Sequence, residues 1–137
     1  MASLRCAVPV LAVAWPVVAG GACDIPAAFP AQNRIDAKDY VLGYRTAPAK
    51  IEIGKHFSVE AVVCPKGAGG AATALRVDAQ MPEHRHGMNY RAKVTPMGDG
   101  RYLADGLMFH MPGRWQFVFD VEGAGKRERL TKDVVVE

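Results

Sequence analysis

The feature that most constrains the fold is an alternation of apolar and polar residues with a period of two. Successive side chains of a β-strand point to opposite faces, so this alternation is typical of antiparallel strands with one buried face. No stretch shows a convincing amphipathic helix. The alternation is clearest over residues 56–63, 75–80, 90–95 and 114–121.

Turn-forming residues separate these stretches and complete the predicted fold. Weaker strands are predicted over residues 40–45, 100–104, 107–111 and 130–136, and Gly-rich or Pro-containing turns lie at residues 67–70, 97–100, 105–106, 112–113 and 123–125. Seven to eight short strands at this spacing predict an all-β fold, an immunoglobulin-like antiparallel β-sandwich over residues 39–137, with a small barrel as the alternative. The predicted core comprises Phe57, Val59, Val63, Leu75, Val77, Tyr90, Val94, Trp115, Phe117 and Phe119.

The first 22 residues have the pattern of a signal peptide. Arg5 is the only charge among the first 23 residues, residues 7–18 are apolar, and small residues follow at 19–22. The apolar run is shorter than the roughly 20 residues of a transmembrane helix, so we expect no membrane span after cleavage; a retained anchor is the alternative. We therefore expect a periplasmic or secreted protein, with residues 23–38 as an extended lead-in to the sandwich.

Two cysteines would remain after cleavage, because Cys6 lies within the predicted signal peptide. An even number of cysteines in an oxidising compartment favours a disulfide between Cys23 and Cys64. Two alternatives stay open at this point. Cys23 could be lipidated, which would anchor the protein and leave Cys64 as a free thiol, or Cys64 could ligate a metal as a thiolate.

Histidine and methionine are concentrated in two short patches. Residues 81–88 contain two of each, and His110-Met111 follows in a second apolar segment. Imidazole and thioether together form a borderline to soft ligand set that suits copper. In an extended chain, His84, His86 and Met88 share one face, about 7 Å apart. We expect that face to continue the core face of the strand over residues 90–94.

The second patch divides between two faces of its predicted strand. Met108 and His110 share one face, while Leu107 and Met111 lie on the other. We predict that the three histidines gather at one end of the sandwich, whereas His56 and Met97 are expected to be solvated. The predicted metal ligands are His84, His86, Met88, His110, Met81 and Met111.

The segment Met81-Pro82-Glu83-His84-Arg85-His86-Gly87-Met88-Asn89-Tyr90, followed by Phe109-His110-Met111-Pro112-Gly113-Arg114-Trp115, resembles the YtkA-like domain proteins. These are small exported or lipid-anchored bacterial proteins with an immunoglobulin-like sandwich. The resemblance covers roughly residues 40–136 and implies copper handling in the cell envelope. The residues before Cys23 depart from the family's lipid-attachment pattern, because no Leu lies three residues before that cysteine.

The predicted function is a periplasmic copper-binding protein, such as a chaperone, buffer or tolerance factor, whose partner is the copper ion. The alternative is a non-metal module that docks or helps to assemble envelope proteins through an exposed methionine-rich surface. No Ser-His-Asp or paired-carboxylate pattern indicates an enzyme, although three histidines also satisfy the ligand count of a zinc hydrolase. A net charge of +3, without a basic stripe of interleaved aromatics, argues against nucleic-acid binding.

Overall fold

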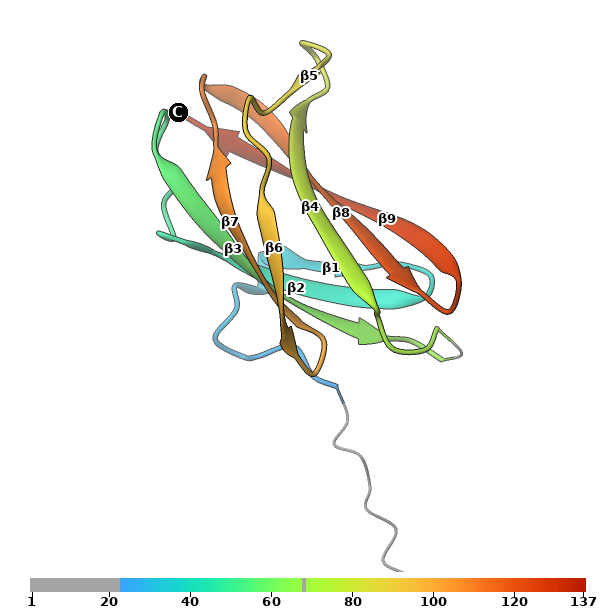
Figure 1. Cartoon of the computed structure of the whole chain (residues 1–137). Helices are drawn as coiled ribbons and strands as arrows, with labels where there is room; N and C mark the ends of the chain where they lie inside the picture. The colour runs from blue at the N-terminus through green and yellow to red at the C-terminus, as the bar shows by residue number, and fades with distance from the viewer. Residues whose placement is uncertain (1–22, 68) are drawn as a thin grey trace, which may run out of the picture.

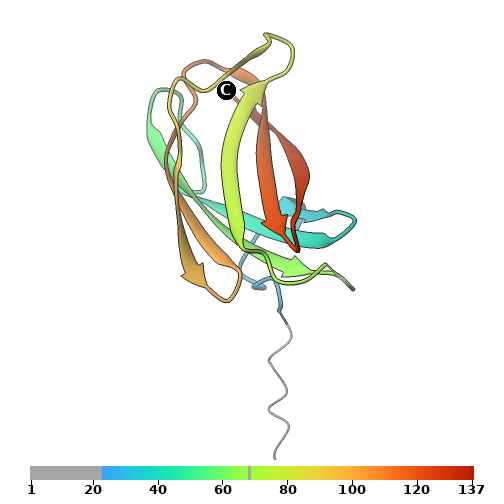
Figure 2. The ribbon, with the colours of Figure 1, turned by 45° about the vertical axis from the view of Figure 1, so that its right-hand side comes forward.

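Two antiparallel sheets pack face to face in a computed structural model that describes residues 23–67 and 69–137 (Figures 1 and 2). One sheet has the strand order β1-β2-β3-β7-β6 and the other has the order β5-β4-β8-β9. The strands are β1 (Arg34–Asp36), β2 (Tyr40–Ala47), β3 (His56–Pro65), β4 (Ala74–Met81), β5 (His86–Gly87), β6 (Lys93–Gly98), β7 (Arg101–Met108), β8 (Gly113–Gly123) and β9 (Lys126–Val136). The predicted sandwich is therefore confirmed, with nine strands in place of seven to eight.

The described residues contain no helix that is both long and apolar enough to span a membrane. The predicted signal peptide lies outside the described residues.

The core follows the predicted alternation. β4 alternates buried and exposed side chains along its length, and Trp115 of β8 is fully buried. Aromatic rings fill the centre, where Phe109 stacks on Trp115 with ring centroids 4.5 Å apart and Tyr44 packs against Phe117 at 5.3 Å. Of the predicted core residues, Val94 is only half-buried and Tyr90 is 44% exposed; the others are buried.

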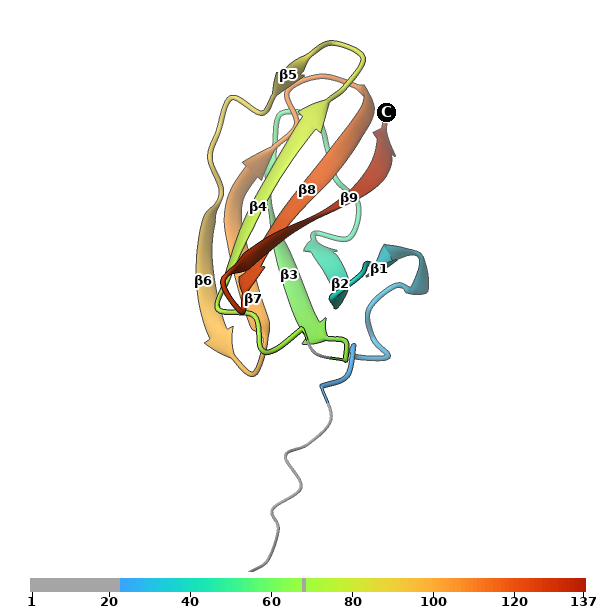
Figure 3. The ribbon, with the colours of Figure 1, turned by 90° about the vertical axis from the view of Figure 1, so that its right-hand side faces the viewer.

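The predicted strand bounds were wrong at two places. The strand predicted over residues 90–95 begins only at Lys93, because residues 88–92 carry the chain from one sheet to the other. The strands predicted over 100–104 and 107–111 are one strand, β7. Gly106, with φ of +85°, lies in a bulge there, where the pairing with β3 shifts by one residue. The lead-in is not merely extended: it contains a short 3₁₀ helix, η1 (Ala31–Asn33), and β1, which pairs with β2 (Figure 3).

Cys23 and Cys64 form a disulfide with Cα atoms 5.4 Å apart, as predicted. The bond ties the lead-in to the end of β3, and it engages both sulfur atoms. Neither sulfur is then left for a lipid thioether or for a metal. Disulfides form and persist in oxidising compartments, so this pairing is typical of exported proteins.

The Tyr44 hydroxyl makes stability sensitive to alkaline pH. Burial raises the pKa of Tyr44 to about 12, whereas an unfolded tyrosine ionises near 10. Between these values the unfolded chain has lost the proton that the folded chain retains, so stability falls as the pH rises. We expect Tyr44→Phe to flatten the decline in the free energy of unfolding between pH 10 and 12, measured by urea denaturation. An unchanged slope would contradict this role.

Candidate metal centre

A tight hairpin between β4 and β5 carries the first histidine patch. β4 ends at Met81, the His84 N–H donates to the Met81 carbonyl at 3.1 Å, and Arg85 adopts a φ of +57°. The chain therefore turns through residues 82–85, at the upper end of the sandwich in Figure 1. The prediction that His84, His86 and Met88 share one continuous face is wrong. Alternate residues share a face only in an extended chain, and the chain turns between His84 and His86.

The hairpin register restores part of that face by another route. His86 lies directly opposite Met81, and the Met88 N–H donates to the Ala79 carbonyl at 3.2 Å. Met81 and Ala79 are both buried side chains of β4. Residues directly opposite one another project from the same face, so His86 and Met88 lie on the core-facing side of this hairpin.

The three predicted histidines come together at this end of the sandwich. The His84 and His86 ring centroids are 5.7 Å apart, and those of His86 and His110 are 5.3 Å apart. Trp115 forms the floor, with its ring centroid 6.0 Å from His86 and 5.4 Å from His110. His110 reaches this place from the connection between β7 and β8, which belong to different sheets. The prediction that these rings gather is confirmed.

The nitrogen atoms of the two central imidazoles differ in their partners. His86 Nδ1 lies 3.0 Å from the Gly87 carbonyl oxygen, which can only accept a hydrogen bond. That contact places the proton on Nδ1 and leaves the Nε2 lone pair free. His110 Nδ1 is buried and has no hydrogen-bond partner among the described residues. A buried polar atom without a hydrogen-bond partner is uncommon in folded proteins, and a bound metal ion would supply the missing partner.

The predicted thioether ligands all lie near the core. Met81 is almost fully buried, while Met88 and Met111 are half-buried and pack against the core cluster. The Met81 methyl sits so close to Gly113 that a Cβ there would approach it to 2.9 Å. The Met111 carbonyl accepts a hydrogen bond of 3.0 Å from Trp115 Nε1. Each side chain fills core space, which is a sufficient structural reason for a methionine.

The arrangement limits the kind of metal centre that the donors form. Within residues 23–67 and 69–137, no three His, Cys, Asp or Glu side chains are grouped so as to hold a metal ion. The donors at this end are therefore the His86–His110 pair with His84 beside it, and neighbouring thioethers. The sulfur donors of this set are neutral thioethers, whereas the sulfur ligands of tetrahedral zinc sites are cysteine thiolates.

Sequence reasoning missed an ionic tether on the hairpin. The Arg114 guanidinium lies 3.1 Å from Glu83 in the β4–β5 turn and 2.7 Å from Asp133 on β9. Hydrogen bonds from Gln116 and Arg114 lower the pKa of Asp133. The contacts link the histidine-bearing turn to two strands of its sheet. The sequence signal for this tether is weak, because its three residues come from separate segments.

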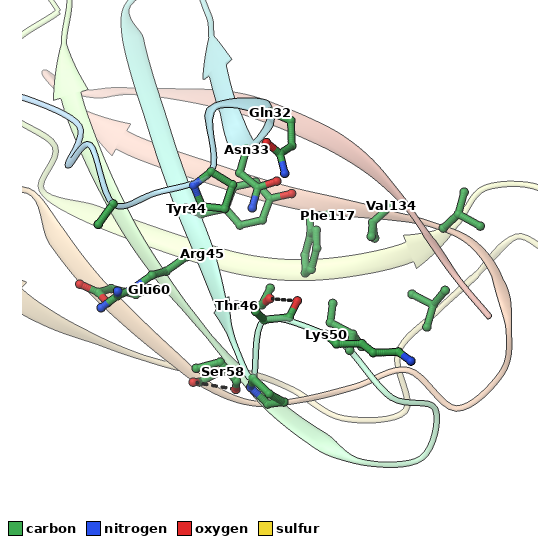
Figure 4. Close-up of a pocket in the computed structure, with 18 of the residues that line it drawn as sticks. Gln32, Asn33, Tyr44, Arg45, Thr46, Lys50, Ser58, Glu60, Phe117 and Val134 are labelled. Carbon is green, nitrogen blue, oxygen red and sulfur yellow. Dashed lines mark hydrogen bonds and ion pairs between the residues drawn. The ribbon is translucent and has the colours of Figure 1, made fainter.

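A cavity of about 960 Å³ lies elsewhere, beside the edges of β2 and β9 (Figure 4). β1 pairs with only residues 41–43 of β2, which leaves the rest of this edge uncovered. Some of its polar side chains are already engaged: Thr46 Oγ1 donates to the Ala49 carbonyl, and Arg45 pairs with Glu60. None of the predicted metal ligands lines this cavity.

Comparisons with known proteins leave the family open. No family model matches the chain, and no curated protein sequence matches it. The resemblance to YtkA-like proteins thus has no support from these comparisons. A DUF4426 family protein from Pseudomonas aeruginosa PAO1 is similar in structure at 14% sequence identity and a TM-score of 0.49, over 75% of this chain and 94% of that chain.

Proposed function

We propose that this chain is a copper-binding protein of the cell envelope that holds Cu(I) between His86 and His110. The unpartnered, buried Nδ1 of His110 beside the His86 ring is the observation that carries this proposal. His86 already donates through Nδ1 to a backbone carbonyl, which is the usual outer-shell contact of a metal-bound imidazole.

The donor chemistry favours Cu(I) over other cations. Thioether sulfur is a soft donor that selects Cu(I), and Met81 is the cross-strand partner of His86. Zinc commonly takes four ligands, or three protein ligands and a water, and the described residues offer no matching group of three. Copper is cargo in this proposal, and the protein acts as a chaperone, buffer or tolerance factor.

The compartment belongs to the same proposal. The Cys23–Cys64 disulfide and the signal-like first 22 residues support export to the periplasm or beyond. The resemblance of residues 81–90 and 109–115 to YtkA-like proteins points in the same direction. A docking module without a metal is the competing function at this surface.

Anaerobic titration of Cu(I) against a competing chelator tests the proposal. We expect His86→Ala and His110→Ala each to weaken binding at least about tenfold, because one of two nitrogen ligands is lost, which corresponds to about 1.4 kcal/mol. Met97→Leu is the matched control, since Met97 is 61% exposed in the β6–β7 hairpin. Wild-type protein that fails to bind Cu(I) below about micromolar would favour the docking module.

The thioether contribution is separable from the histidines. Met81→Leu and Met88→Leu conserve apolar volume and remove sulfur, so a ligand role appears as weaker Cu(I) binding with little change in stability. Unchanged Cu(I) binding in both variants would make this a plain histidine site, for which zinc becomes the better candidate.

A further inference from the structure

We infer that His56 and Met108 form a second, solvent-accessible Cu(I) site, flanked by the Tyr90 ring, at the same end of the sandwich. The inference extends the proposed copper function to side chains outside the His86–His110 pair. It reverses the expectation that His56 is simply solvated.

Strand pairing brings the two donors together. His56 begins β3 and lies directly opposite Met108, the last residue of β7. Side chains of directly opposed residues project from one face with Cβ atoms about 4.5–5.5 Å apart. The next pair, Phe57 and Leu107, is buried in the core. His56 and Met108 therefore project from the outer face of the five-stranded sheet.

Tyr90 forms a wall beside this pair. Its ring centroid is 5.1 Å from that of His56, with the planes at 78°. Tyr90 belongs to the segment that leads into β6, and β6 pairs with β7 on the side of β7 away from β3. Tyr90 is one of few large apolar side chains left exposed in the described residues. An aromatic ring beside an imidazole–thioether pair attracts a bound cation through its π face.

Exposure distinguishes this pair from the His86–His110 pair. His56 is exposed and Met108 is half-buried, whereas His110 Nδ1 is buried above Trp115. A groove beside β4 and β6 is lined by Met88, a candidate thioether of the first site, and by Tyr90, which flanks the second. An open two-ligand site exchanges metal readily, and the half-buried His86–His110 pair, with its one buried nitrogen, retains it longer. The outer pair is thus the place where Cu(I) enters or leaves.

The test combines Cu(I) stoichiometry with NMR spectroscopy of ¹³C-methyl methionine in the full chain under anaerobic conditions. With the Cys23–Cys64 disulfide intact, we expect two equivalents per wild-type chain and a shift of the Met108 methyl signal. The double variant His56→Ala/Met108→Leu should bind one equivalent. The double variant His86→Ala/His110→Ala should also bind one, and its Met108 methyl should still shift. Met97→Leu should retain both equivalents.

The outcomes separate this inference from the proposed function. An unmoved Met108 methyl, with one equivalent bound by wild type and by His56→Ala/Met108→Leu, would overturn the second site and leave the first intact. A Met108 shift in wild type without any effect of His86→Ala/His110→Ala would overturn the first site instead. Thermal unfolding of His56→Ala/Met108→Leu checks that the variant is folded. Both side chains face outward, so we expect its melting temperature to stay close to that of wild type.

Discussion

Replacing Trp115 with alanine is expected to lower the free energy of unfolding by about 3–5 kcal/mol. Trp115 is fully buried, stacks on Phe109 and donates its Nε1–H to the Met111 carbonyl at 3.0 Å. The substitution removes the largest side chain of the core and leaves a cavity between the sheets. It also deprives the Met111 carbonyl of its donor, which adds to the cost when the carbonyl stays buried.

Urea denaturation followed by circular dichroism measures this loss. Trp115→Phe is the matched variant: it keeps an aromatic ring and loses the indole N–H, so we expect a smaller cost of about 1–2 kcal/mol. Both variants also report on the proposed copper site, because the indole packs against the His86 and His110 rings. A cost below about 1 kcal/mol for Trp115→Ala would mean that the core closes around the gap, contrary to the expected rigid packing.

The predicted alternation located the core because burial in a strand depends on local parity. Trp115, Phe117 and Phe119 face inward as expected, and the register of β8 is that of the prediction. The predicted burial of Tyr90 was wrong for a local reason too. Tyr90 lies between β5 and β6, outside any strand, so the alternation of its neighbours does not determine which side it faces. Alternation alone does not distinguish such a crossing from a strand.

The gathering of the histidines was predicted on an argument that the structure corrects. The prediction assumed an extended chain through His84 and His86, yet the positive φ of Arg85 breaks that chain. The rings meet because Met81 and His86 are paired in a hairpin and because His110 leaves β7 at the same end of the sandwich. Only the tertiary arrangement brings His110 beside His86, so spacing in the sequence indicated the donors and not their geometry.

The second prediction with a large effect concerns the disulfide. Removing the Cys23–Cys64 bond is expected to lower the free energy of unfolding by about 4 kcal/mol, the chain-entropy value for a bridge with a sequence separation of 41 residues. The bond also holds a small apolar cluster of Phe29, Val62 and Cys64. Ile25 packs against it and so close to Gly43 that no Cβ fits there.

The measurement compares urea denaturation of the oxidised protein with that of the double variant Cys23→Ala/Cys64→Ala. A reducing agent should destabilise the wild type and leave the double variant unaffected, which separates loss of the bond from loss of the side chains. A difference below about 1 kcal/mol between oxidised and reduced wild type would contradict this prediction. It would show that the bond restricts the denatured chain much less than the chain-entropy value implies.

The same double variant is also the control for the copper-binding measurements. Reductants that maintain Cu(I) also open disulfides, and the two thiols released would form a soft site that competes with His86 and His110. Cys64 lies near the end of β3 opposite to His56, so its replacement is remote from both proposed copper sites (Figure 1). We therefore expect Cys23→Ala/Cys64→Ala to retain Cu(I) binding under reducing conditions. Loss of binding in this variant would reassign the copper ligands to the cysteines.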